Sequence, residues 1–170
     1  VQIATILGTI QSTLTDFKFL SKKWIKNTED ERLLGVSFTG IMDHEVMNGS
    51  KGNEILEKWL TDLRKVAILT NAEWAKKLGI PMATAISCVK PSGTVSQLTD
   101  TASGIHARHN PYYLRTVRSD KKDPLAKLMI DSGFYYEEDK MRPDHNWVFY
   151  FPQKAPKNAI YRNDKTAIEQ

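Results

Sequence analysis

One long amphipathic stretch constrains the fold of this chain more than any other feature of its sequence. Between about Asn53 and Leu78, apolar side chains recur every three or four residues and form a single stripe. Gly79 follows directly and Pro81 lies just beyond, which is a common way for a helix to end. The spacing therefore predicts one long helix over residues 53–78, with an apolar face that other elements must cover.

Short apolar segments before and after this helix predict strands. They are residues 33–39, 83–90, 112–118 and 147–151. A further helix is expected after Asp123, because aspartate is a good N-cap and Pro124 suits the first helical position. Alternating strands and helices are typical of an α/β protein whose parallel strands are buried on both faces.

Both ends of the sequence carry signals of interrupted helices. Apolar residues repeat at helical spacing from Ile3 to Phe17, with no N-cap residue ahead of them. Thr166 and Glu169 have the spacing of a capping box, which begins a helix, yet the sequence stops at Gln170. We therefore expect residues 1–170 to be a single segment of a larger domain, truncated at both ends.

Composition and charge exclude several classes of protein. With 41% hydrophobic and 26% charged residues, the chain has the balance of a globular protein. No apolar run reaches the roughly 18 residues of a membrane span, so we expect no membrane association. The net charge of +4 is spread along the sequence, and we expect no direct nucleic-acid binding. The single cysteine and the lack of a signal peptide favour the cytoplasm.

The candidate binding site follows the second predicted strand. It consists of Pro91, Ser92, Gly93, Thr94, Val95 and Ser96. Proline ends a strand, glycine allows close backbone approach, and the hydroxyls together with a helix N-terminus would suit a phosphate. The plainer interpretation is that Ser92 or Thr94 caps a helix, and local composition alone favours it.

A family resemblance favours phosphate binding over simple helix capping for this segment. Residues 87–118, SCVKPSGTVSQLTDTASGIHARHNPYYLRTVR, strongly resemble a segment of class II, adenosylcobalamin-dependent ribonucleotide reductases. Three other stretches resemble the family in the same order, namely ATILGTIQSTLTDF, ERLLGVSFTGIMD, and YFPQKAP with DKTAIEQ. The KPSGTVS and SGIH sequences are most similar to the monomeric branch, which reduces ribonucleoside triphosphates.

This resemblance implies both a fold and a role. The family fold is a ten-stranded α/β barrel of two five-stranded parallel halves, and this chain would be part of the second half. Residues 33–39 and 83–90 would line the barrel, and Pro91 to Ser96 would hold the substrate's phosphates. The implied substrate is a ribonucleoside triphosphate, the cofactor adenosylcobalamin and the reductant of the thioredoxin type. A dNTP or ATP effector would bind outside this segment, and the enzyme would be a monomer.

The catalytic cysteines that the resemblance implies are absent from this sequence. The family uses a thiyl radical, a pair of reducing cysteines and an Asn-x-Cys-x-Glu type motif, whereas this chain has only Cys88. We expect Cys88 to be a small buried residue of its strand. The chain is therefore expected to contain no catalytic residue and to be inactive by itself.

Other residue patterns are expected to be structural. His106 and His109 lack further ligands, so we expect no metal site, and we expect His106 to shape the floor near the loop. We assign the tyrosine pairs at 112–113 and 135–136 to packing. For Asp43, His44 and Glu45 we predict only a loop. A solvated basic face is expected for Arg108, Arg115, Arg118, Lys121 and Lys122.

Two alternative functions stay open at this point. One is a non-catalytic nucleotide- or phosphate-binding module. The other is a segment of a class I or dimeric class II enzyme that reduces diphosphates. An Asn-x-Cys-x-Glu type motif and a third cysteine upstream of Val1 would distinguish a reductase from a module.

Overall fold

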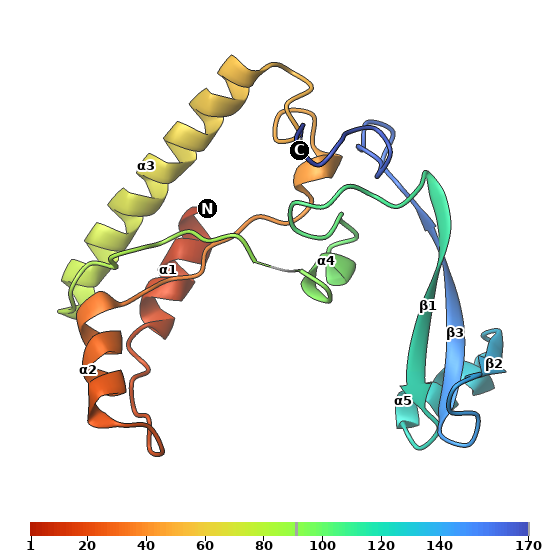
Figure 1. The fold of residues 1–170 in the computed structure, drawn as a ribbon. Coiled ribbons are helices and arrows are strands. Elements are labelled where there is room, and N and C mark those ends of the chain that lie inside the picture. Colours follow the sequence, from red (N-terminus) through yellow and green to blue (C-terminus); the bar gives the residue numbers. More distant parts are fainter. Residues whose placement is uncertain (91, 170) are drawn as a thin grey trace. The chain divides into compact units, whose positions relative to one another are not determined.

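The chain divides into two compact units in a computed structural model that describes residues 1–90 and 92–169 (Figure 1). Unit 1 comprises Val1–Ala107 with Asn158–Ile160, and unit 2 comprises Arg108–Lys157 with Tyr161–Gln170. None of the helices in the described ranges is long and apolar enough to cross a membrane.

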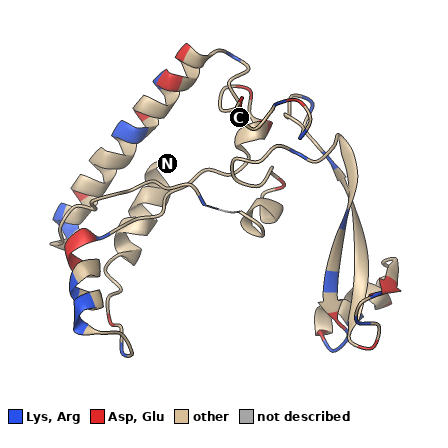
Figure 2. Cartoon of the chain, in the orientation of Figure 1, with Lys and Arg blue, Asp and Glu red and all other residues tan. Residues whose placement is uncertain are grey.

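Unit 1 is built around the predicted long helix. Its helices are α1 (Gln2–Gln11), α2 (Lys22–Glu31), the 3-10 helix η1 (Ile41–Asp43), α3 (Asn53–Leu78) and α4 (Val95–Leu98). Helix α3 has the predicted bounds and ends at Gly79, which adopts the left-handed conformation (φ +66°). Basic and acidic residues both occur along this helix (Figure 2). The prediction for this helix is confirmed.

A buried asparagine joins α3 to its neighbours. The Asn71 side chain is almost fully buried, and its Nδ2 donates to Thr9 Oγ1 of α1 at 3.0 Å. Its Oδ1 accepts the Ala83 N–H at 2.9 Å. One side chain therefore fixes both the packing of α1 on α3 and the start of the following extended segment.

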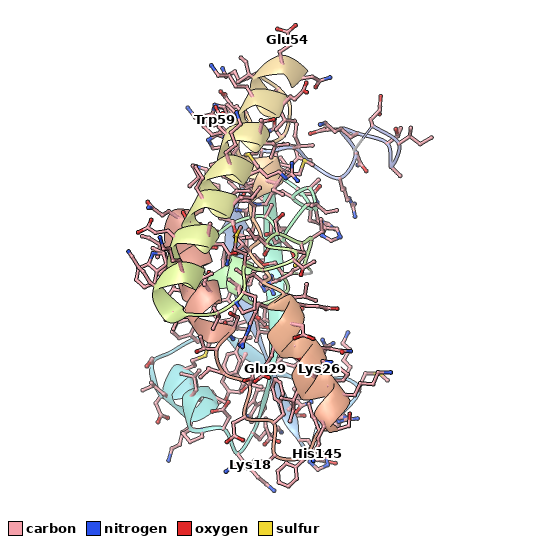
Figure 3. The ribbon with its side chains drawn as sticks, turned by 90° about the vertical axis from the view of Figure 1, so that its left-hand side faces the viewer. Lys18, Lys26, Glu29, Glu54, Trp59 and His145 are labelled. Atoms are coloured by element: carbon pink, nitrogen blue, oxygen red, sulfur yellow. The ribbon has the colours of Figure 1, made fainter. Side chains whose placement is uncertain are left out.

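Helix α2 was not anticipated from the sequence. Ser21 caps it by accepting the Trp24 N–H. On the same helix lies Glu29, which is labelled in Figure 3. Its side chain accepts a hydrogen bond from Thr15 Oγ1 at 2.8 Å. The Arg32 guanidinium donates to the Ser12 carbonyl at 2.6 Å, so α2 is tied to the end of α1.

The first two predicted strands pair in parallel, but the pairing is short. A bridge joins Val36 to Ser87, and hydrogen bonds run from Leu34 N to Ala85 O and from Cys88 N to Val36 O. The expected burial on both faces is wrong here, because Leu33 and Val89 are 58% and 75% exposed. Leu34 alone is buried, against Gly8 of α1, and no further strand lies beside this pair in the described residues.

Unit 2 contains an antiparallel sheet. Its strands are β1 (Tyr112–Asp120), β2 (Tyr136–Glu138) and β3 (Asn146–Lys154), in the order β1-β3-β2. The strands at 112–118 and 147–151 were predicted, but their expected parallel arrangement is wrong. All nine residues of β1 pair antiparallel with β3, for example Thr116 with Tyr150. A periodicity of two locates a strand without fixing the direction of its partner.

Packing in unit 2 centres on aromatic residues of β3. Phe149 is 1% exposed, and Trp147 meets Tyr136 edge-on with 4.8 Å between ring centroids. Helix α5 (Pro124–Asp131) begins as predicted, with Asp123 accepting the Leu125 N–H at 2.9 Å. The predicted capping box also forms, since Thr166 N donates to Glu169 Oε2 at 2.8 Å. This bond lowers the pKa of Glu169.

Candidate phosphate-binding site

The candidate loop of unit 1 folds back on itself through two serines. The Ser92 hydroxyl accepts the Ser96 N–H at 3.2 Å, and the Ser96 hydroxyl donates to the Ser92 carbonyl. Ser96 is fully buried and begins the single turn of α4 with Val95. Pro91, which the sequence analysis included, lies outside the described residues. Ser92 thus makes the capping contact that the plainer interpretation expected.

Two distant segments of unit 1 hold this loop in place. The Thr39 hydroxyl lies 3.1 Å from the Ser92 hydroxyl and accepts the Gly104 N–H at 3.1 Å. The Ser103 hydroxyl donates to the Ser92 carbonyl at 2.6 Å, and Asp43 Oδ2 accepts the Ala102 N–H, also at 2.6 Å. These side-chain hydrogen bonds fix the shape of the loop.

Sequence reasoning missed three of these supporting residues. Thr39 and Asp43 lie in the ERLLGVSFTGIMD stretch, and Ser103 begins SGIH. The family resemblance of these two stretches was the available indication that their residues belong to the same site as the loop. Asp43 is more than the plain loop residue that was predicted, because its carboxylate anchors residue 102. His106 Nδ1 lies 2.9 Å from the Ser103 carbonyl, which puts the histidine next to a residue that contacts the loop.

A glycine makes the close approach of these segments feasible. Gly104 has φ +56°, and a Cβ there would lie 3.0 Å from the Lys90 carbonyl oxygen. Both the backbone conformation and the contact disfavour any larger residue. This explains physically why the SGIH sequence has glycine at this position.

The outward side of the loop is open. Gly93, Thr94 and Val95 are exposed, and a Cβ built on Gly93 would meet no atom within 4 Å. Thr94 occupies the N-cap position of α4 but makes no capping hydrogen bond with its side chain. The capping interpretation therefore accounts for Ser92 and leaves Thr94 facing outward, where its hydroxyl could donate to a ligand.

A groove of about 860 Å³ lies between α3 and the parallel strand pair in unit 1. Leu60, Leu63 and Ala67 of α3 form one wall, and residues 82–90 form the other. Cys88 lines this groove and is exposed, so the prediction that it is a buried core residue is wrong. The sequence predicted that residues 83–90 would be buried on both faces, whereas these residues line the open groove.

The remaining candidate residues lie in unit 2. The Arg162 Nη1 is 2.9 Å from His109 Nε2, which gives this histidine a structural contact. Tyr135 and Tyr150 both donate to Glu137, at 2.6 and 2.8 Å, and these bonds lower the pKa of Glu137. Arg108 is 4% exposed, so the expected solvated basic face does not include it. The other four basic residues named with it keep that assignment as a prediction.

Comparison with known proteins identifies a solved structure with the same fold. No family model matches the chain. A crystal structure of a B12-dependent, class II ribonucleotide reductase superposes with a TM-score of 0.72 over 94% of this chain and 26% of that one, at 22% identity. The fold is that of a segment of a class II ribonucleotide reductase.

Sequence relatives point to the same enzymes. The adenosylcobalamin-dependent ribonucleoside-triphosphate reductase of Euglena gracilis is 27% identical over 139 residues, which is 82% of this chain and 19% of the relative. Its counterpart in Lactobacillus gasseri is 29% identical over 146 residues, 73% of this chain and 20% of the relative. The chain thus spans about one fifth of the length of these relatives. It is homologous to a segment of adenosylcobalamin-dependent ribonucleoside-triphosphate reductases, which confirms the resemblance found in the sequence.

Proposed function

We propose that this chain is a segment of an adenosylcobalamin-dependent ribonucleoside-triphosphate reductase and that its loop at residues 91–96 holds the substrate's phosphates. The observation that carries this proposal is the loop itself. Ser92 and Ser96 are tied to Thr39 and Ser103, while Gly93 and Thr94 face outward. Such a fixed loop with an exposed hydroxyl and glycine suits phosphate oxygens.

Each residue of the loop has a distinct part in this proposal. Thr94 donates its hydroxyl to a phosphate oxygen, and Gly93 lets the phosphate approach the backbone. Ser92 and the buried Ser96 keep the loop in shape through their mutual hydrogen bonds. The proposed site also includes Val95 and, by its place in the sequence, Pro91. The two units would form part of the second half of a ten-stranded α/β barrel, as one segment of that domain.

The chemistry of the reaction would come from the rest of the enzyme. Adenosylcobalamin supplies a radical when it is bound, and the family needs several cysteines to use it. This chain has one cysteine, so it cannot supply both a radical thiol and a reducing pair. A thioredoxin-type reductant, an effector site elsewhere and a monomeric, cytoplasmic enzyme complete the proposal.

The proposal is tested on the full-length protein that contains this segment. Purified protein is incubated with CTP, adenosylcobalamin and a thioredoxin system, and the formation of dCTP is measured. We expect dCTP only when adenosylcobalamin is present. Activity that requires a metal-bearing partner subunit would indicate a class I enzyme. Cobalamin-dependent reduction of CDP in preference to CTP would indicate a dimeric class II enzyme. Nucleotide binding without any reduction would leave a phosphate-binding module.

A further inference from the structure

The turn between α1 and α2 carries large apolar side chains that unit 1 leaves uncovered. Phe19 is 97% exposed, Leu20 is also exposed, and Trp24 in the first turn of α2 is 59% exposed. None of these three side chains lines the groove of unit 1. Figure 1 shows the turn projecting beyond the end of α1. Residues 18–26, which we call the basic-aromatic tip, therefore present apolar side chains on a protruding part of the chain.

The basic-aromatic tip also carries four exposed lysines, namely Lys18, Lys22, Lys23 and Lys26. None of the four forms an ion pair among the residues that the structure describes. Helix α2 is basic at its start and acidic at its end (Figure 2). This order opposes the helix macrodipole, which favours acidic residues at the start of a helix. The lysines therefore do not stabilise α2, and their charge is available to an anionic partner.

Charge distinguishes the basic-aromatic tip from the exposed apolar face of α1. Ile3, Leu7 and Ile10 of α1 are also exposed, but no charged side chain precedes Asp16 in the sequence. The relatives are about five times as long as this chain, and an uncharged apolar face suits burial against the rest of such a protein. Burial of four unpaired lysines would instead carry a large desolvation cost. The tip therefore suits solvent or an anionic partner.

The shape of the basic-aromatic tip distinguishes among anionic partners. Lysines and aromatic rings together can bind single-stranded nucleic acid, but such sites follow the backbone along a groove. Acidic or amphipathic peptides also dock in grooves. A bilayer surface needs no groove, because protruding apolar side chains enter the boundary between headgroups and acyl chains while lysines stay at the headgroups. A protruding turn with exposed apolar side chains and flanking lysines fits a bilayer best.

We propose that the basic-aromatic tip docks on an anionic lipid bilayer, with Phe19, Leu20 and Trp24 in the interface and the four lysines against anionic headgroups. Such docking needs no membrane-spanning helix, so the inference departs from the expectation of no membrane association, which concerned spanning segments. It goes beyond the proposed function and shares no residue with the phosphate loop. The binding is reversible and weakens with salt, because a few apolar side chains and screened charges hold it.

The test is co-sedimentation of the full-length protein with lipid vesicles at low and high salt. We expect binding to vesicles of phosphatidylcholine with phosphatidylserine at low salt, and little binding to phosphatidylcholine alone. Lys22→Gln and Lys23→Gln should each weaken binding by about fivefold. Phe19→Ser should weaken binding without changing its salt dependence, because it removes apolar contact and no charge. The matched control is the pair Lys58→Gln and Lys76→Gln, which removes two exposed lysines of α3 and should change nothing.

Three results would overturn the inference. The first is a wild-type protein that does not sediment with the anionic vesicles at low salt. The second is vesicle binding that the lysine and Phe19 variants leave unchanged, since another surface would then be responsible. The third is binding of oligothymidylate or a polyglutamate peptide, lost in the Lys22 and Lys23 variants, by a protein that ignores vesicles. None of these results bears on CTP binding, so failure of this inference leaves the proposed function to its own test.

Discussion

Units 1 and 2 are stabilised in different ways. Unit 2 rests on a regular ladder in which nine residues of β1 pair with β3, covered by aromatic side chains such as Phe149. The loop region of unit 1 has only a short parallel bridge, and hydroxyls and a carboxylate hold its irregular segments together. Regular pairing provides stability, whereas side-chain hydrogen bonds to irregular backbone provide a defined loop shape. We therefore expect mutations in unit 2 to affect folding and mutations in the loop to affect binding.

The largest expected effect is in unit 2. Phe149→Ala should lower the free energy of unfolding by about 3–5 kcal/mol, because it removes a fully buried ring from the centre of β3. Chemical denaturation of the full-length protein measures the loss, and hydrogen exchange at the amides of β1 and β3 locates it. Tyr112→Ala is the control, since that ring is 69% exposed and its loss should matter little. A small effect of Phe149→Ala would contradict our view of the sheet.

The next effect is in the helical part of unit 1. Asn71→Ala leaves the Ala83 N–H without its acceptor and removes the donor to the buried Thr9 hydroxyl, which keeps only its bond to the Thr5 carbonyl. This change should cost about 1–3 kcal/mol of stability. Asn71→Asp keeps an acceptor for the Ala83 N–H but buries a carboxylate in a site that is 1% exposed, so at neutral pH it should cost at least as much stability. Protection of α1 and α3 amides from exchange is the measurement. Unchanged protection in both variants would show that α1 and α3 do not depend on this side chain.

A binding effect without a stability effect is expected in the loop. Thr94→Ala should weaken CTP binding by about 1–3 kcal/mol, because the hydroxyl would donate to a phosphate oxygen. Its exposure and lack of a capping bond predict an unchanged unfolding transition. Thr61→Ala, which removes an exposed threonine hydroxyl of α3, is the control. If Thr94→Ala binds CTP normally, Thr94 has no role in the site.

The smallest effect concerns pH in unit 2. Hydrogen bonds from Asn146 and from the Met141 N–H lower the pKa of Asp139, with a further contribution from Arg118. A carboxyl group whose pKa is lowered by folding stabilises the protein above its ordinary pKa of about 3.9, and this contribution is lost as the pH falls through the lowered value. Asp139→Asn should therefore flatten the acid limb of the melting-temperature profile. An identical acid limb in the variant would contradict this assignment.

Local sequence signals correctly predicted several helices and helix caps. They did not predict the direction of strand pairing or the burial of individual residues. The stripe at 53–78, the cap at Asp123 and the capping box at Thr166 are all properties of neighbouring residues, and all three are confirmed. The direction of β1 against β3 and the exposure of Cys88 depend on partners far away in the sequence, and both predictions were wrong. The loop was found by its composition and by family resemblance, whereas Thr39 is 53 residues from Ser92 and no local pattern connects the two.

The most direct test of the central claim is CTP titration of the full-length protein carrying Gly93→Val. A Cβ at this position meets no protein atom within 4 Å, so the variant should fold and melt like the wild type. If the loop holds phosphates, the added side chain occupies the space that the ligand needs, and CTP binding should be strongly weakened while adenosylcobalamin binding is unchanged. Normal CTP binding by the folded variant would contradict the account, because the loop would then lie outside the phosphate site.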